Sequence, residues 1–243
     1  MIRNEPFAYY AVKSVYDYAD AILLYDTGSD DPIALDGVAR LIKEDTQGKI
    51  KFKPLQIADA SQWVATRRAT ISAPLGALRQ QQINDTQTEF FLLVDGDEVH
   101  YREGIQKIVE EIIPNWPPGK ESCYLPVRWH SDLYQFIARK FAPSFLQGRL
   151  FHTEGVFVKG AYPTEMHCSK STGRILWKSC PESFIITQIP SFVHFEPYLK
   201  PRRRTIDRGR RRFRGPLPEV MGDDTFIKRY QDAVQAQAAS TGE

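Results

Sequence analysis

Three carboxylates directly follow a short apolar run in the first half of the chain. Residues 90–94 read Phe-Phe-Leu-Leu-Val, and Asp95, Gly96, Asp97 and Glu98 come next. A buried strand that ends in this way brings two oxygen ligands to one point at the edge of a sheet, and the glycine lets the backbone turn tightly there. Paired carboxylates repel each other unless a cation or a proton lies between them. The motif therefore predicts a Mg²⁺ or Mn²⁺ site, with a solvated acidic turn as the alternative.

The composition predicts one large domain with a basic appendage. The chain has 243 residues, of which 42% are hydrophobic, and a formal net charge of +2, which suits a single core. Residues 202–214 hold eight arginines against one acid, Asp207, so the basic character is local. We therefore expect a domain over residues 1–200 and an arginine-rich appendage over residues 201–243.

Cysteine usage and hydropathy favour a cytoplasmic protein. The three cysteines, Cys123, Cys168 and Cys180, form no C-x-x-C pair, which argues against a disulfide framework or a zinc ribbon and favours a reducing compartment. The first residues do not read as a signal peptide, and no apolar run approaches the ~18 residues of a membrane span. We expect no transmembrane segment. Peripheral contact with an anionic membrane surface through residues 202–214 is an open alternative.

The first 113 residues alternate helical and extended patterns. Asn4 and Pro6 are typical of a helix start, and the periodicity of apolar residues predicts the other elements. These are a helix over 7–18, a strand over 21–25, a helix over 33–43, a strand over 49–57, a helix from 74, a strand over 90–94 and a helix over 101–113. This order predicts a parallel sheet covered on both faces. Ligands bind beyond the carboxyl ends of such strands, where Asn4, Asp26 and Asp95 would lie.

The second half has a different pattern. Strands are predicted at 123–129, 149–152, 156–159 and 184–189, without regular helices between them. This half is therefore expected to be mixed or antiparallel sheet with loops. The polar sequence after residue 200 predicts an appendage with one short helix near 224–238.

Several motifs, taken in order, resemble glycosyltransferase family 2, particularly its bacterial and viral members. They are Ile2-Arg-Asn-Glu5, Leu23-Leu-Tyr-Asp-Thr-Gly-Ser-Asp30, Gly76-Ala-Leu-Arg-Gln80, Val94-Asp-Gly-Asp-Glu98, Gly160-Ala-Tyr-Pro-Thr-Glu165 and Phe192-Val-His-Phe195. The resemblance covers roughly residues 1–200. It implies the GT-A fold, an α/β, Rossmann-like mixed sheet flanked by helices. One departure is the first strand, because only Met1 and Ile2 precede Arg3.

The resemblance also implies an activity, namely the inverting transfer of a sugar from a UDP- or GDP-linked donor to an acceptor hydroxyl. Asp95 and Asp97 would hold Mn²⁺ or Mg²⁺ against the charge that grows on the leaving diphosphate, and His194 would complete the metal site. Asp26 would face the nucleobase and ribose. The other residues that match nucleotide-binding positions are Asn4, Glu5, Gly28 and Arg79, together with Asp95. The acceptor would be a glycan, a lipid-linked molecule or a protein.

Inversion needs a base that takes the proton of the acceptor hydroxyl. Glu165, in the acceptor-side segment, is the first candidate for this carboxylate. Glu154 and Asp132 are rivals, and His167 lies close enough in sequence to share the site.

Other functions fit parts of the sequence. The arginines of residues 202–214 could close on the donor diphosphate, bind an anionic membrane surface, bind nucleic acid or form a solvated tail. The alternatives to a glycosyltransferase are a nucleic-acid-binding module on an α/β domain, a nucleotidyltransferase of similar fold that uses the same aspartate pair, and an inactive homologue.

Overall fold

The computed structural model describes most of the chain. The described residues are 2, 4–55, 73–132, 135–137, 145–159, 166–176, 180–185, 191–195, 212–214 and 216–222, without the side chains of 73–75, 128–132, 135–137, 145 and 212–214. Glu165, the side chain of Asp132 and the expected helix near 224–238 lie outside them, so these predictions stand untested.

Helix α1 (Ala8–Tyr16) forms the predicted first helix but begins later than the sequence suggested. Its buried side chains include Ala8, Ala11, Val12 and Val15. The N-cap is Phe7, which makes no side-chain hydrogen bond to the helix. Asn4 is not the cap, because it adopts a positive φ of 49° and its amide oxygen accepts from the backbone N–H groups of Asp30 and Asp31 at 2.8 and 2.9 Å. Asn4 therefore organises a neighbouring turn instead.

The prediction of parallel pairing is confirmed for the first two strands. Strand β1 (Ile22–Asp26) pairs in parallel with β2 (Ile50–Pro54), and α2 (Pro32–Glu44) connects them. Asp31 caps α2 by accepting from the backbone N–H groups of Ile33 and Ala34, as a short acidic side chain before a proline at the first helical position commonly does. Ile2 adds a parallel bridge to Asp26 on the other edge of β1.

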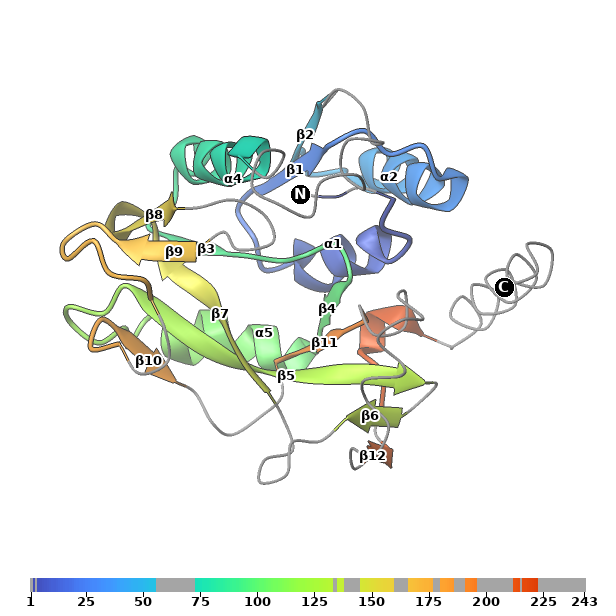
Figure 1. Cartoon of the computed structure of the whole chain (residues 1–243). Helices are drawn as coiled ribbons and strands as arrows, with labels where there is room; N and C mark the ends of the chain where they lie inside the picture. The colour runs from blue at the N-terminus through green and yellow to red at the C-terminus, as the bar shows by residue number, and fades with distance from the viewer. Residues whose placement is uncertain are drawn as a thin grey trace, which may run out of the picture.

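The following strands are not parallel to their partners. Helix α4 (Ala73–Asp85) precedes β3 (Phe90–Leu92), which pairs antiparallel with β7 (Phe145–His152). Strand β4 (Glu98–His100), which the sequence did not predict, pairs antiparallel with β11 (Phe192–His194). Alternation of helix and strand along the chain predicted a wholly parallel sheet, but the partners of β3 and β4 come from the second half of the chain. The result is a mixed α/β fold with a curled mixed sheet (Figure 1).

Strand β5 (Ser122–Asp132) is the long central strand of the sheet. One of its edges pairs antiparallel with β7 and then with β6 (Gln135–Ile137). Its other edge pairs in parallel with β10 (Ser183–Ile185) and then with β11. The predicted mixed sheet of the second half is confirmed. Strands β8 (Val156–Lys159) and β9 (Met166–Ser169) form a separate antiparallel pair.

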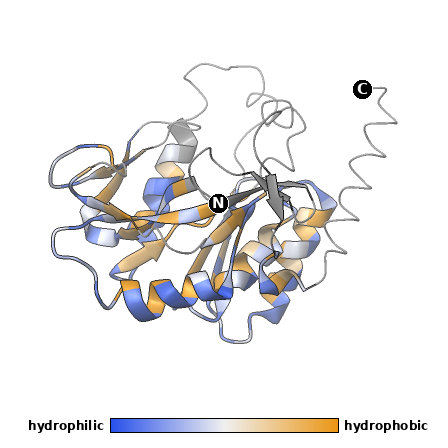
Figure 2. Ribbon diagram, turned by 90° about the horizontal axis from the view of Figure 1, so that it is seen from below, coloured by the Kyte–Doolittle hydropathy of each residue, from blue (hydrophilic) through white to orange (hydrophobic). Residues whose placement is uncertain are grey.

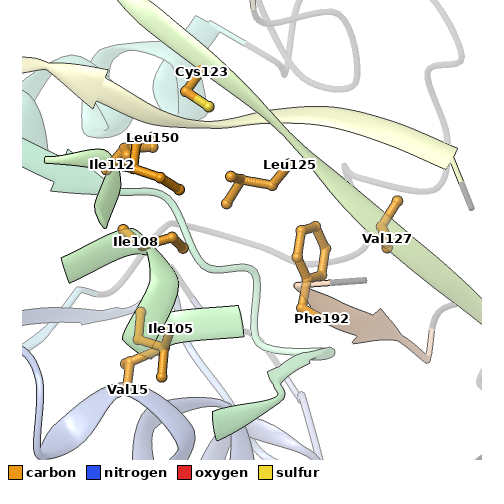
Figure 3. Close-up of a cluster of buried hydrophobic side chains, with 9 residues drawn as sticks. All are labelled: Val15, Ile105, Ile108, Ile112, Cys123, Leu125, Val127, Leu150 and Phe192. Carbon is orange, nitrogen blue, oxygen red and sulfur yellow. The ribbon is translucent and has the colours of Figure 1, made fainter. Parts of the chain in front are cut away.

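The largest apolar cluster joins a helix to this sheet. The predicted helix over 101–113 consists of α5 (Arg102–Lys107) and a π-helical turn, η1 (Ile108–Ile112). Ile105, Ile108 and Ile112 recur along its buried face. Figure 3 shows them in one cluster of buried side chains with Leu125 of β5, with Ile105 drawn beside Val15 and Ile112 beside Leu150. Spacing of three and four residues places such side chains on one helical face.

Part of the expected appendage packs against the domain. Strand β12 (Arg212–Arg214) pairs antiparallel with β6, and residues 216–222 include a 3-10 turn, η3 (Glu219–Met221). The hydroxyl of Tyr101 donates to the carbonyl of Pro216 at 2.9 Å. Met221 is 5% exposed and belongs to a buried cluster with Phe7 and Phe195. These residues therefore extend the core beyond residue 200.

Hydropathy follows the layers of the fold. Figure 2 shows mainly apolar strands and helices that alternate apolar and polar residues along their length, as helices that cover a sheet do. Among the described residues, no helix has the length and apolar character needed to cross a membrane.

Candidate functional site

The acidic turn, residues 95–98, lies where the chain leaves β3 and enters β4. The backbone N–H of Leu93 donates to the carbonyl of Arg149 at 2.7 Å, and that of Glu98 donates to the carbonyl of Asp95 at 3.0 Å, which closes the turn. A Cβ atom on Gly96 would lie 2.9 Å from Cβ of Glu5 and 3.0 Å from Cγ2 of Ile2. Glycine is required here because the N-terminal segment approaches so closely.

Two arginines hold the carboxylate of Asp95. Its Oδ1 accepts from Arg79 of α4 at 2.6 Å, and its Oδ2 accepts from Arg149 of β7 at 2.8 Å. Burial alone would raise the pKa of Asp95, but the guanidinium groups of Arg149 and Arg79 outweigh it and hold this pKa well below its usual range. Asp95 is therefore ionised at neutral pH.

Glu98 is the most deeply buried acid of the turn. Its side chain is 0% exposed and forms an ion pair with Arg149, and one of its oxygens accepts from the backbone N–H of Asp95 at 3.2 Å. Burial raises the pKa of Glu98 to about 7, although Arg149 opposes the shift. One guanidinium thus serves two carboxylates of the same turn.

Asp97 pairs with the histidine that ends β11. Oδ2 of Asp97 lies 3.3 Å from Nε2 of His194, and each side chain is 10% exposed. Burial lowers the pKa of His194, but the neighbouring Asp97 carboxylate more than reverses this and raises the pKa to about 9. The backbone N–H of Phe195 donates to the carbonyl of Asp97 at 2.8 Å, which fixes the turn against β11. The structure therefore brings together the predicted pair of Asp97 and His194.

Asp26 organises a second turn, residues 26–31, at the end of β1. Its Oδ1 accepts from the backbone N–H groups of Gly28 and Ser29 at 3.2 and 2.9 Å and from the Ser29 hydroxyl at 2.7 Å. Gly28 has a φ of +98°, which side chains rarely adopt. Asn4 closes the turn from the other side, with its amide nitrogen 2.6 Å from Oδ1 of Asp30.

The N-terminal segment joins these two turns. Ile2 pairs with Asp26 in the sheet, and Ile2 and Glu5 both contact Gly96 of the acidic turn. The predicted common edge of one parallel sheet is not found, because β1 and β2 form a sheet of their own and β3 belongs to the eight-stranded sheet; Ile2 and Glu5 connect the two turns instead. Three chain segments that are far apart in sequence therefore present polar groups at one place.

The rival bases are placed differently. Glu154 lies in the exposed turn η2 (Thr153–Gly155) after β7, where the N–H of Thr153 bonds the carbonyl of Glu89 at 2.8 Å. This is the end of β3 opposite to the acidic turn, so Glu154 does not join the site. His167 of β9 stacks on Phe151 at 4.4 Å between ring centroids, and its burial beside Arg79 and Arg149 lowers its pKa to about 3.

A cavity of about 490 Å³ opens beside the acidic turn, within the size range of ligand pockets. Its wall is largely apolar and comes from α1, β1, β3 and η1, and Arg79, Asp95 and His167 also line it. The residues of the Asp26 turn do not line it. The cavity therefore reaches the arginine-held carboxylate of Asp95 but not Asp26, which is buried outside its lining.

The side chains of Asp95, Asp97 and His194 are of types that bind divalent metals, but in this structure they form ion pairs within the protein. Two carboxylates and an imidazole are ligands that Mn²⁺ accepts. Among the described residues, however, no three histidine, cysteine or acidic side chains are placed to hold a metal ion. Asp95 bonds two arginines, and His194 is protonated at neutral pH. Metal binding would therefore require an exchange of partners and the loss of a proton from His194.

Sequence reasoning missed Arg149 and the burial of Glu98. The apolar pattern over 149–152 predicts only a strand there, whereas an arginine within an apolar strand indicates a buried ionic partner. Its partner Asp95 lies 54 residues away, and no local pattern connects two such positions.

Neither a protein-family model nor a curated protein sequence matches this chain.

Proposed function

We propose that this chain is a metal-dependent inverting glycosyltransferase that resembles family 2 and its GT-A fold. The observation that supports this proposal best is the connection between the acidic turn and the Asp26 turn through Ile2 and Glu5 of the N-terminal segment. A nucleotide-diphosphate sugar needs both a place for its nucleoside and a charged place for its diphosphate. The two adjacent turns offer these two environments.

Each turn would contribute a different part of donor binding. Gly28 and Ser29 keep the backbone of the Asp26 turn open to close approach by a nucleoside. Asp95 and Asp97 supply carboxylates beside the cationic side chains of Arg79 and His194. A divalent cation bound by the two aspartates would supply positive charge against the leaving diphosphate. Arg79 would add a fixed positive charge at the same place.

A thermal-shift experiment with UDP and GDP, with Mn²⁺ or with EDTA, tests the proposal. A ligand that binds only the folded state raises the melting temperature by mass action. We expect one of the two nucleotides to raise the Tm in Mn²⁺ and not in EDTA. A shift only with oligonucleotides at low salt would instead support the nucleic-acid-binding module.

The variant Asp97→Ala tests the metal site within this experiment. We expect the Mn²⁺-dependent nucleotide shift to disappear, with each shift measured against the variant's own ligand-free Tm because His194 loses its ionic partner. Asp36→Ala is the matched control, since Asp36 is exposed on α2 and its variant should keep the wild-type shift. An unchanged shift in Asp97→Ala would remove the metal-dependent part of the proposal.

Glu165 is proposed as the base that accepts the proton of the acceptor hydroxyl. In that role it acts after the donor has bound, so Glu165→Ala should keep the nucleotide-induced Tm shift and lose sugar transfer. Release of UDP or GDP from the sugar nucleotide in the presence of acceptor is the measurement. Normal turnover would place the base elsewhere.

A further inference from the structure

We propose that Arg79 and Arg149 form a diphosphate-binding site, and that the carboxylate of Asp95 occupies this site in the ligand-free protein. The inference rests on the proposed function only for the source of the diphosphate. The anion site itself is argued from the contacts of these three residues. Asp95 would be an internal substitute for a phosphate group of the ligand.

The geometry of the ion pairs is that of an anion held between two cations. Arg79 comes from α4 and Arg149 from β7, and their terminal nitrogens contact different oxygens of the same carboxylate at 2.6 and 2.8 Å. Neither arginine binds Asp95 in the bidentate manner, because each contacts this carboxylate through a single nitrogen. A planar guanidinium can bind two acceptor oxygens at once, so both arginines have binding capacity that Asp95 does not use.

Unpaired donors support this interpretation. Nε of Arg79 and Nε of Arg149 are both buried and have no hydrogen-bond partner among the described residues. The side chain of Arg79 is 9% exposed. Buried polar groups are normally hydrogen-bonded, so two such donors beside one ion pair indicate a missing acceptor. A diphosphate offers more acceptor oxygens than a carboxylate.

Access to the site is open on the side of the cavity. Arg79 and Asp95 both line the cavity of about 490 Å³, and the side chain of Asp95 is 32% exposed. An anion in the cavity can therefore reach Arg79 directly, and it can reach Arg149, which does not line the cavity, if Asp95 turns away. Glu98 would keep Arg149 in place during this exchange, because the Glu98 side chain that pairs with that guanidinium is fully buried.

A purely structural ion pair is the competing explanation. In that case Arg79 and Arg149 only fasten the acidic turn to α4 and β7, and removing the charge of Asp95 would weaken the fold without creating affinity for anions. The two explanations differ in one measurement, the anion affinity of an Asp95→Asn variant. It rises if Asp95 occupies an anion site and does not rise if the ion pair is only structural.

The test is calorimetric titration with inorganic pyrophosphate in EDTA, which excludes metals. When Asp95 occupies the site, the apparent affinity for pyrophosphate equals the intrinsic affinity multiplied by the fraction of molecules in which the site is free. Asp95→Asn should therefore bind pyrophosphate about tenfold tighter than wild type. Asp36→Asn removes the same charge from an exposed position on α2 and should bind like wild type. Equal affinities of Asp95→Asn and wild type would overturn the proposal.

A double variant assigns any gain to the arginines. Arg79→Gln is the suitable second change because Arg79 contacts Asp95 and Gln82, whereas Arg149 also neutralises the buried Glu98. In Asp95→Asn/Arg79→Gln the gain should be lost, and a retained gain would overturn the site. This result is independent of the glycosyltransferase proposal. That proposal fails if no nucleotide raises the wild-type Tm in Mn²⁺, regardless of how pyrophosphate binds in EDTA.

Discussion

Each carboxylate of the acidic turn has a cationic neighbour within the protein. Asp95 contacts Arg79 and Arg149, Glu98 contacts Arg149, and Asp97 contacts His194. Carboxylates packed this closely repel one another unless positive charge lies between them. Here the protein supplies that charge, so a bound cation must compete with existing ion pairs. We therefore expect metal affinity to depend on the protonation of His194.

His100 provides a residue-scale prediction of pH dependence. It is 1% exposed, both ring nitrogens have no hydrogen-bond partner among the described residues, and burial lowers its pKa to about 3. Below about pH 6.5, His100 is therefore protonated in the unfolded chain but stays neutral in the folded protein until the pH approaches 3. Stability is full above about pH 6.5 and falls as the pH drops toward 3.

The variant His100→Leu isolates this effect. Between pH 7.5 and pH 5.0 wild type should lose about 2 kcal/mol of unfolding free energy through His100, and the variant should be spared that loss. At pH 7.5 the variant should be at least as stable as wild type, because two unpaired ring nitrogens are removed. Urea denaturation at both pH values measures the difference. Equal losses in the two proteins would contradict the prediction.

At the scale of elements, α5 and the segment before β11 meet through a glycine. A Cβ atom on Gly104 would lie 2.6 Å from the carbonyl oxygen and 2.7 Å from Cα of Ser191. Ser191 is held there by its own backbone, since its N–H donates to the carbonyl of Pro126 at 2.7 Å and its carbonyl accepts from Tyr101 at 3.0 Å. Backbone atoms on both sides leave no flexible group that can move aside.

We therefore expect Gly104→Ala to destabilise the protein by about 1–3 kcal/mol through overpacking. Gly37→Ala in α2 is the matched control, because its Cβ would meet Cβ of Tyr9 at 3.4 Å and alanine favours a helix over glycine by up to about 1 kcal/mol. The control should be neutral or stabilising. Chemical denaturation measures both variants, and a harmless Gly104→Ala would show that α5 can shift away from Ser191.

At the scale of the whole molecule, residues near the C-terminal end complete a core that begins near the N-terminus. Met221 packs in a cluster with Phe7 of the N-terminal segment, Val99 of β4 and Phe195 after β11. The rings of Phe7 and Phe195 stack with centroids 4.5 Å apart. The domain boundary expected at residue 200 rests on composition. Composition does not reveal that a short apolar segment after the arginine-rich run, residues 216–222, packs on the core.

Met221→Ala tests whether this segment stabilises the domain. Loss of a buried methionine side chain should cost about 2–5 kcal/mol, with a clearly lower Tm. Leu35→Ala on α2 is the control, because Leu35 is 43% exposed and should lose little stability. If Met221→Ala kept the wild-type Tm, residues 216–222 would contribute little to the core.

Local patterns predicted the local features of this protein. Helix α1, strands β1 and β2 and the turn after β3 follow from apolar periodicity and from polar residues that end an element. The same reasoning predicted one sheet edge for Asn4, Asp26 and Asp95, but β1 and β3 belong to different sheets. Periodicity and turn chemistry act between residues a few positions apart, so they can be read from the sequence.

The side chains that pair with the acidic turn could be identified only from the tertiary structure. Asp95 meets Arg149 because β3 pairs with β7, and Asp97 meets His194 because β4 pairs with β11. Strand pairing over such separations depends on which apolar faces can be buried together, and this is a property of the whole chain. The sequence thus identified the carboxylates that could do chemistry, whereas tertiary packing set the cations beside them and hence their charge states.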